Sequence, residues 1–172
     1  VFEGNRPSNA ILFEKLTPGP ISFLLPKSDK VPDYVTANTS KVCIRIPSND
    51  TALAFLKKVN TPICAPSANS YCHASATCAN HILEDFSDLD ILILDDMYKD
   101  TVIGIESTIV EINFKDKIID FLRPGFITPS MLCTIYQDYD FRYTLNNIVA
   151  GSTMKHYSIN KNIYVYNNPF KV

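Results

Sequence analysis

The fold prediction starts from one stretch, Thr61-Pro62-Ile63-Cys64-Ala65-Pro66-Ser67-Ala68-Asn69-Ser70. A short apolar segment that ends at a proline, followed by alternating Ser and Asn, predicts a buried strand over 62–65 and then a tight turn. In open sheets, ligands usually bind at the carboxyl ends of such strands. Ser67 and Asn69 lie two residues apart, so in extended backbone both side chains would point toward one small polar ligand. The alternative is a β-turn whose Ser and Asn only satisfy their own backbone.

Four further stretches share this mixture of apolar residues with Gly, Pro and a charged or hydroxyl group. In chain order they are Pro18-Gly19-Pro20-Ile21, Lys41-Val42-Cys43-Ile44-Arg45-Ile46-Pro47, Ile103-Gly104-Ile105-Glu106-Ser107-Thr108-Ile109-Val110 and Leu122-Arg123-Pro124-Gly125. With Ala65-Pro66-Ser67-Ala68-Asn69 between the second and third, we name these five stretches the Pro-Gly-Pro, Arg-x-Pro, Ser-Ala-Asn, Glu-Ser-Thr and Arg-Pro-Gly motifs. Their order and spacing resemble the YrdC-type threonylcarbamoyl-AMP synthases, and Met154–Ser158 resembles the linker of that family's longer members.

The composition fits one soluble globular domain. The chain has 172 residues, of which 46% are hydrophobic and 20% charged, enough to bury a core. A formal charge of −2 argues against a strongly basic nucleic-acid surface. No apolar run approaches the roughly 20 residues of a membrane helix, and no signal pattern is visible, so we expect a cytoplasmic protein.

The cysteines predict neither disulfides nor a metal site. Five Cys are an odd number without a framework spacing, and Cys43 and Cys64 are expected to be small buried hydrophobes. Cys72, His73 and Cys78 are three candidate ligands where structural zinc needs four. His81 is expected to be a structural residue on a helix face.

Strands and helices are mixed without strict alternation, which predicts an α/β or α+β fold with a twisted mixed sheet. The expected strands are 20–26, 41–47, 62–65, 89–94, 105–114 and 117–122, the last two forming a β-hairpin. The expected helices are 51–59, capped by Asp50 or Thr51; 77–86, capped by Ser75 or Thr77; and one opened by Thr128-Pro129-Ser130 that runs to Tyr136. We expect a domain over 1–145 and a linker or tail over 146–172.

The resemblance implies an activity. Members of the family join L-threonine, bicarbonate and ATP into threonylcarbamoyl-AMP and release pyrophosphate. The product serves the transferase machinery that makes N6-threonylcarbamoyladenosine at position 37 of tRNA. Such a reaction needs a carbamate held in line with the α-phosphorus, and cationic side chains with Mg²⁺ to offset the charge. It needs no covalent nucleophile.

The resemblance also assigns site residues by position. Arg6, in Asn5-Arg6-Pro7, matches the Arg of the family's Lys-x-Arg-Pro. The implied catalytic residues are Arg6, Ser67 and Asn69. The implied nucleotide-binding residues are Arg6, Pro66, Ser67, Asn69 and Arg123, and the implied threonine or carbamate-binding residues are Ser107, His156 and Tyr157.

Each of these residues also has a structural alternative. Arg45 and Arg123 could be solvated charges at strand ends, and Ser107 could simply belong to a hairpin. Glu106 could lie on the surface or orient an arginine. His156 and Tyr157 could be ordinary tail residues.

Departures from the family pattern predict weak activity. Gly4 stands where the family has the first Lys of Lys-x-Arg-Pro, and the family's upstream Pro-Thr-Glu-Thr-x-Tyr-Gly segment would precede Val1. After Asn69 the chain also lacks the usual Gly and Pro. Either a fragment or a decayed relative fits these departures. We expect no pyrophosphate release above background and weak binding of ATP or AMP.

Two other functions stay open. A non-catalytic module could bind double-stranded RNA or tRNA on the concave face that the family fold implies. Such a face should gather basic residues, whereas the candidates are scattered along the chain: Lys41, Arg45, Lys57, Lys58 and Arg123. A related carbamoyl-transfer domain would use carbamoyl phosphate in place of threonine.

Overall fold

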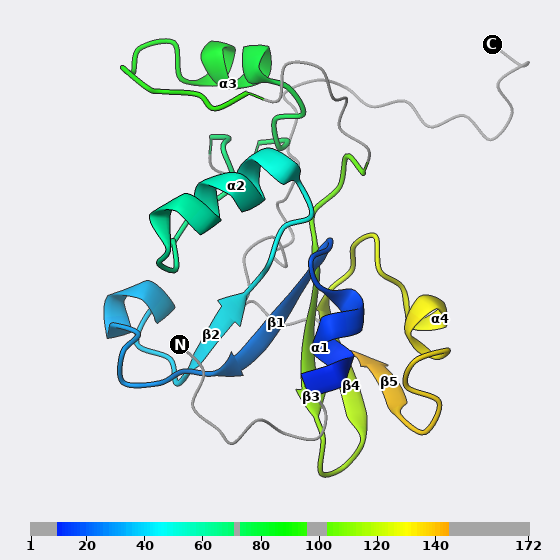
Figure 1. The fold of residues 1–172 in the computed structure, drawn as a ribbon. Helices are drawn as coiled ribbons and strands as arrows, with labels where there is room; N and C mark the ends of the chain where they lie inside the picture. The colour runs from blue at the N-terminus through cyan, green and yellow to red at the C-terminus, as the bar shows by residue number, and fades with distance from the viewer. Residues whose placement is uncertain (1–9, 71–72, 96–102, 145–172) are drawn as a thin grey trace, which may run out of the picture.

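Residues 10–70, 73–95 and 103–144 are described by a computed structural model of the chain, in which five strands form one mixed sheet. The strands are β1 (Ile21–Pro26), β2 (Lys41–Ile44), β3 (Thr108–Asn113), β4 (Ile118–Arg123) and β5 (Asp140–Tyr143). Their order is β2-β1-β3-β4-β5. The β1–β3 and β4–β5 pairs are parallel, and the other two pairs are antiparallel (Figure 1).

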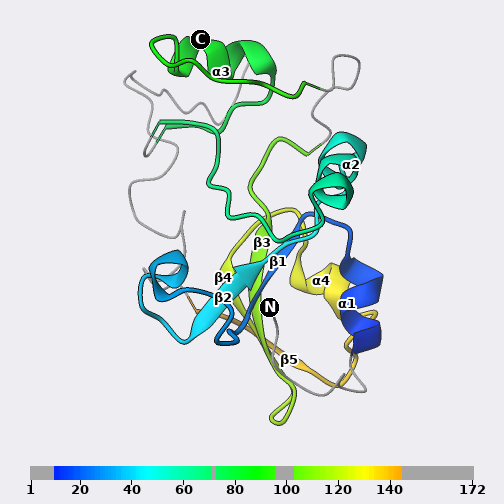
Figure 2. The same cartoon turned by 60° about the vertical axis from the view of Figure 1, so that its left-hand side comes forward.

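The α-helices occupy two regions around this sheet, and one 3₁₀ helix packs beside β2. They are α1 (Ala10–Leu16), the 3₁₀ helix η1 (Asp33–Thr36), α2 (Asp50–Val59), α3 (Ala79–Asp85) and α4 (Pro129–Leu132). In both views α1 and α4 lie on the same side of the sheet, while α2 and α3 lie beyond the end at which β2 finishes (Figures 1 and 2). Neither α2 nor α3 contains a buried residue.

The core lies between the sheet and the α1–α4 side. Alternate strand residues point to one face, and here that face is apolar. The buried core combines this face with residues of the segment after β4, and its members are Ile21, Phe23, Val110, Ile119, Phe121, Ile127, Leu132 and Tyr136. Phe13 of α1 packs edge-on against Phe23, with ring centroids 4.6 Å apart. Burial of this apolar area is the main force that holds the layers together.

On the other face of the sheet the buried apolar cluster is smaller, and more polar groups are present. Ile109 and Leu122 form a second buried cluster against Leu24. Ser22, two residues before Leu24 in β1, is also buried. Lys41 of β2 forms an ion pair with Glu111 of β3 across the sheet. This second face therefore offers polar groups next to a small apolar floor.

The expected α+β class is confirmed, as are four of the expected strands. The expected strands 20–26 and 41–47 contain β1 and β2, and the 105–122 hairpin corresponds to the β3–β4 pair, of which β4 extends one residue further, to Arg123. Two of them are clearly shorter than expected: β2 ends at Ile44 and β3 begins only at Thr108. The strand β5 and the helix α1 were not predicted.

The strands expected over 62–65 and 89–94 are wrong. Both segments are irregular, and most of their apolar side chains are exposed, Ile63 by 42% and Leu92 by 90%. A continuous apolar run is compatible with a buried strand, but a strand also needs a neighbour to satisfy its backbone hydrogen bonds. In the described sheet, neither segment has such a neighbour.

The helix predictions are correct in position and less so in their caps. For α2 the cap is Asn49, whose side chain accepts the Ala52 N–H at 2.8 Å, in place of the expected Asp50 or Thr51. Cys78 occupies the N-cap of α3 without a side-chain bond, so Ser75 and Thr77 do not cap that helix. As expected, α4 starts with Pro129 in its first turn after Thr128, but it ends at Leu132.

The expected burial of two cysteines is wrong, because Cys43 and Cys64 are both exposed. Cys43 lies on the edge strand β2, and Cys64 lies in the irregular 62–65 segment.

His81 is on α3, as expected, with Nδ1 3.3 Å from the Thr77 hydroxyl. The described residues contain no group of three potential metal ligands, and none of their helices has the length and apolar character to cross a bilayer. Cys72 and the tail expected over 146–172 lie outside the described residues.

Tyr136 carries a buried hydroxyl that finds no hydrogen-bond partner among the described residues. The residue is 1% exposed, and burial raises the pKa of its phenol. A buried polar group without a partner carries a desolvation penalty, so its removal is neutral or stabilising. We therefore expect Tyr136→Phe to raise the free energy of unfolding by up to about 1 kcal/mol in urea titrations.

Tyr143→Phe is the control for this substitution, because Tyr143 is 60% exposed and should leave stability unchanged. A loss of stability in Tyr136→Phe would mean that the hydroxyl is bonded, for example to a buried water molecule.

Candidate active site

Three of the five motifs are joined by backbone hydrogen bonds at one end of the sheet. The Gly19 N–H of the Pro-Gly-Pro motif donates to the Ile46 carbonyl of the Arg-x-Pro motif at 2.9 Å. The Thr108 N–H of the Glu-Ser-Thr motif donates to the Pro20 carbonyl at 3.0 Å. At this end β1 and β3 begin while β2 and β4 finish. The motifs thus meet where the parallel pair β1–β3 starts and the parallel pair β4–β5 finishes, because strands of this mixed sheet run in both directions.

The Arg-Pro-Gly motif joins this end through Gly125. A Cβ atom at position 125 would lie 2.5 Å from both the Glu106 carbonyl oxygen and the Thr108 nitrogen. Real side chains do not approach backbone atoms so closely, so only glycine lets the two motifs pack together. Next to it, the Thr108 hydroxyl donates to the Ile127 carbonyl at 2.8 Å and accepts the Ile127 N–H at 2.9 Å.

Arg123 is the last residue of β4, and its side chain donates hydrogen bonds to the Glu-Ser-Thr motif. Its Nε and Nη2 donate to the Ser107 carbonyl at 3.1 and 2.9 Å, and Nη2 also donates to Ser107 Oγ at 3.0 Å. The side chain is only 12% exposed. The alternative of a solvated strand-end charge is therefore wrong for Arg123, whereas Arg45, after the end of β2, is exposed.

Glu106 places a negative charge beside this guanidinium. Its Oε2 is 3.6 Å from Arg123 Nη2, and its Oε1 accepts a hydrogen bond from Ser75 Oγ. Of the two alternatives for Glu106, the structure supports the second: its side chain lies beside an arginine and is not a solvated surface charge. Its bond with Ser75 ties the segment that precedes α3 to the motif end of the sheet.

Ser107 is buried and its hydroxyl has a second partner, Ser22 of β1. The two Oγ atoms are 2.8 Å apart, and both residues are about 95% buried, with exposed fractions of 5% and 4%. Sequence reasoning missed Ser22. The available signal was a polar residue between Ile21 and Phe23, which places it on the second face of a strand whose first face is core.

The Ser-Ala-Asn motif is tied to α3. Asn69 Nδ2 donates to the carbonyls of Ser70 and His73 at 2.8 and 3.2 Å, so the β-turn alternative correctly describes this amide group. Its Oδ1 is buried and has no hydrogen-bond partner among the described residues. The Ser70 N–H donates to Asp85 Oδ2 at 2.7 Å and lowers the pKa of that carboxyl.

Pro66 and Ser67 are exposed, and a bend at Ala68 and Asn69 interrupts the extended chain that would align Ser67 with Asn69. The structure brings Ser107 and Arg123 into contact, while a common ligand for these two with Ser67 and Asn69 stays a prediction. Arg6, His156 and Tyr157 lie outside the described residues.

Comparison with known proteins identifies the family. The model of the Sua5/YciO/YrdC family, described as "Telomere recombination", matches residues 4–125. The threonylcarbamoyl-AMP synthase of Pyrococcus abyssi is 36% identical over 115 residues, which are 67% of this chain and 33% of the relative. The enzyme of the same name from Bacillus subtilis is 37% identical over 131 residues, or 75% and 37% of the two chains. The chain thus spans about a third of the length of these relatives.

Solved structures agree with the sequence relatives. The structure of P. abyssi Sua5 complexed with L-threonine superimposes with a TM-score of 0.71 and 30% identity, covering 82% of this chain and 40% of that one. A variant of the same protein, with alanine replacing a neighbouring His and Tyr, gives 0.72 over the same shares. E. coli YciO, at 18% identity and a TM-score of 0.57 over 69% and 56% of the chains, shares the fold. This chain belongs to the Sua5/YciO/YrdC family.

Proposed function

We propose that this chain is part of a threonylcarbamoyl-AMP synthase, a nucleotidyltransferase that joins L-threonine, bicarbonate and ATP for the N6-threonylcarbamoyl modification of tRNA. The single observation that carries the proposal is the contact of Arg123 with Ser107, made where the Glu-Ser-Thr and Arg-Pro-Gly motifs pack on each other. The names of the relatives support the activity, and the L-threonine in the P. abyssi complex supports the substrate.

Arg123 is proposed to bind the nucleotide through its phosphates or ribose. A guanidinium held by three hydrogen bonds loses little freedom when it meets a phosphate, which favours both binding and charge stabilisation. Glu106 offsets part of this charge and would keep the arginine in place when the site is empty. Arg6 would supply a second cation.

Ser67 and Asn69 are proposed to hold the nucleotide near the reacting centre, with Pro66 shaping the turn. The Oδ1 of Asn69 is a buried acceptor without a hydrogen-bond partner among residues 10–70, 73–95 and 103–144, which suits a donor group of a ligand. Their role would be to align the carbamate with the α-phosphorus, since alignment supplies much of the rate of such a transfer.

Ser107, His156 and Tyr157 are proposed to bind the threonine and carbamate end. The His-Tyr order matches the residue types replaced in the P. abyssi variant. Mg²⁺ would arrive bound to the ATP phosphates, as it usually does at nucleotide sites. The proposed setting is the cytoplasm, with the tRNA-modifying transferase downstream.

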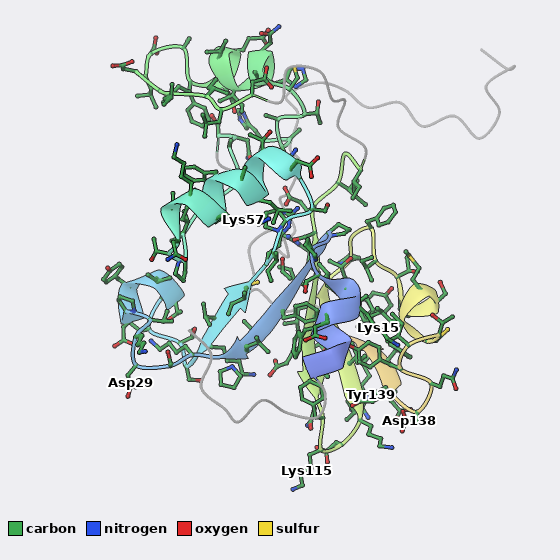
Figure 3. The ribbon with its side chains drawn as sticks, viewed as in Figure 1. Lys15, Asp29, Lys57, Lys115, Asp138 and Tyr139 are labelled. Carbon is green, nitrogen blue, oxygen red and sulfur yellow. The ribbon has the colours of Figure 1, made fainter. Side chains whose placement is uncertain are left out.

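The RNA-binding alternative receives less support from the described charges. Lys41 pairs with Glu111, Lys27 with Asp33 and Lys117 with Asp138. The labelled Lys15, Lys57 and Lys115 lie on separate parts of the molecule (Figure 3). An RNA-binding surface instead needs clustered and available cations. A carbamoyl-phosphate reaction would differ in not depending on L-threonine.

The test of this proposal is nucleotide binding by calorimetry. We expect Arg123→Ala to weaken ATP binding roughly 10-fold or more, because a charge-assisted contact is lost. We expect Asn69→Ala to weaken it about 5-fold, the value of one neutral hydrogen bond. Arg142→Ala, an exposed arginine on β5, is the matched control and should bind as the parent does.

If Arg123→Ala and Asn69→Ala bind ATP as tightly as the parent chain, the placement of the nucleotide is wrong. Pyrophosphate release is measured in parallel, and we expect none above background. Strong release that requires L-threonine would establish the reaction and disprove the expected impairment. A salt-dependent gel shift with duplex RNA, without ATP binding, would instead favour the RNA-binding module.

A further inference from the structure

Ser22 is a buried polar residue that lies outside all five motifs. It sits in β1 between the core residues Ile21 and Phe23, and it is 4% exposed. Because side chains alternate along a strand, its hydroxyl points to the face opposite the core. There its Oγ lies 2.8 Å from Ser107 Oγ. This bond links two parts of the chain that are 85 residues apart.

The Ser107 hydroxyl can make a limited number of hydrogen bonds. A serine hydroxyl has one donor and two acceptor positions. Arg123 Nη2 donates to Ser107 Oγ at 3.0 Å and therefore occupies one acceptor position. Ser22 takes either the other acceptor position or the proton. In both cases the hydroxyl is held from two sides and cannot rotate freely.

Arg123 depends on this fixed hydroxyl and on the carbonyl of the same residue. Its Nε and Nη2 donate three hydrogen bonds to the Ser107 carbonyl and hydroxyl, and these bonds help to fix the plane of the guanidinium. A Ser107 side chain that turned away would remove one of these three bonds and loosen the plane of the guanidinium. The chain of contacts therefore runs from Ser22 through Ser107 to Arg123.

We propose that Ser22 is a positioning residue, which orients the Arg123 guanidinium for an anionic ligand by holding the Ser107 hydroxyl. The assignment of that ligand as ATP rests on the proposed function. The hydrogen bonds that run from Ser22 through Ser107 to Arg123 do not rest on that function, so a measurement without ATP can test them.

The binding test compares three variants in calorimetry with Mg²⁺-ATP. We expect Ser22→Ala to weaken binding about 3- to 10-fold, as loss of one buried hydrogen bond does. Ser22→Thr keeps the hydroxyl and should restore affinity. Ser28→Ala is the matched control, because Ser28 is 7% exposed and its hydroxyl has no hydrogen-bond partner among the described residues; its affinity should not change.

A double-mutant cycle separates positioning from a general loss of structure. In an Arg123→Ala background, Ser22→Ala should have no further effect on affinity, because the group that it positions is gone. If Ser22→Ala weakens binding equally with and without Arg123, the proposal is overturned.

The second readout needs no ligand. The Arg123 Nε–H donates to a buried carbonyl, so its NMR signal should exchange slowly with water in the parent chain and in Ser28→Ala. We expect exchange to be about 10-fold faster in Ser22→Ala, since local opening becomes easier. Unchanged exchange would refute the role of Ser22. If the parent chain binds no ATP, the proposed function fails, while the exchange rates still decide this inference.

Discussion

Replacing Gly125 with alanine should lower the free energy of unfolding by about 3 kcal/mol, the upper part of the usual range for overpacking. The new Cβ would lie 2.5 Å from the Glu106 carbonyl oxygen and the Thr108 nitrogen, and 2.8 Å from the Ser107 carbonyl carbon. All three are backbone atoms, so no side chain can turn aside to make room. Relief requires the Arg-Pro-Gly and Glu-Ser-Thr motifs to separate. Urea unfolding followed by circular dichroism measures the loss.

Gly104→Ala is the matched control in the same region of the sequence. Gly104 has a positive φ of 67°, but a Cβ there would meet nothing within 4 Å. The substitution should therefore cost only about 1 kcal/mol of backbone strain. Equal losses in the two variants would show that the close contact at Gly125 costs no more than the backbone strain at Gly104. Separation of the motifs should also speed the exchange of the Arg123 Nε–H, since Arg123 binds Ser107 at this contact.

Sequence reasoning placed the elements whose pattern and partners are local. The hairpin of β3 and β4 follows from two apolar segments with a polar turn between them, and the paired residues are close in the chain. For α2, helical spacing of apolar residues sufficed. These elements carry their own pattern, so no knowledge of the rest of the fold is needed.

The errors fall where tertiary context decides. Leu92 lies in an apolar run that reads as a buried strand, yet it is 90% exposed because the described sheet does not extend to it. The short strand β5 pairs in parallel with β4, and the sequence of its four residues does not predict this pairing. The cap of α2 is one residue earlier than expected, because Asn49 competes with Asp50 and Thr51 for the same role.

The candidate site divides in the same way. The resemblance selected Ser107 and Arg123, and the structure places them in contact. It did not select Ser22 or Ser75, whose partners are Ser107 and Glu106. A serine that supports another residue shows no motif of its own, since its role exists only after β1 and β3 pair. Positioning residues of this kind are found from contacts and not from patterns.

Thr108→Val is expected to destabilise the chain by about 2–3 kcal/mol, because valine keeps the shape and removes a buried hydroxyl. Thr108 is fully buried, and its hydroxyl both accepts the Ile127 N–H at 2.9 Å and donates to the Ile127 carbonyl at 2.8 Å. Loss of the hydroxyl leaves a backbone donor and a backbone acceptor of Ile127 without that partner. An unsatisfied buried group costs about 1–3 kcal/mol.

Thr108→Ser keeps the hydroxyl and loses one methyl group, so it should cost only about 1 kcal/mol. A greater loss of stability in Thr108→Ser than in Thr108→Val would mean that packing, and not hydrogen bonding, sets the role of Thr108.

The Thr108 bonds and the Gly125 contact hold the same two segments together, 106–108 and 125–127. We therefore expect Thr108→Val combined with Gly125→Ala to lose clearly less stability than the sum of the two, since neighbouring sites that share one contact are not additive. Full additivity would show instead that the two residues act on separate parts of the fold.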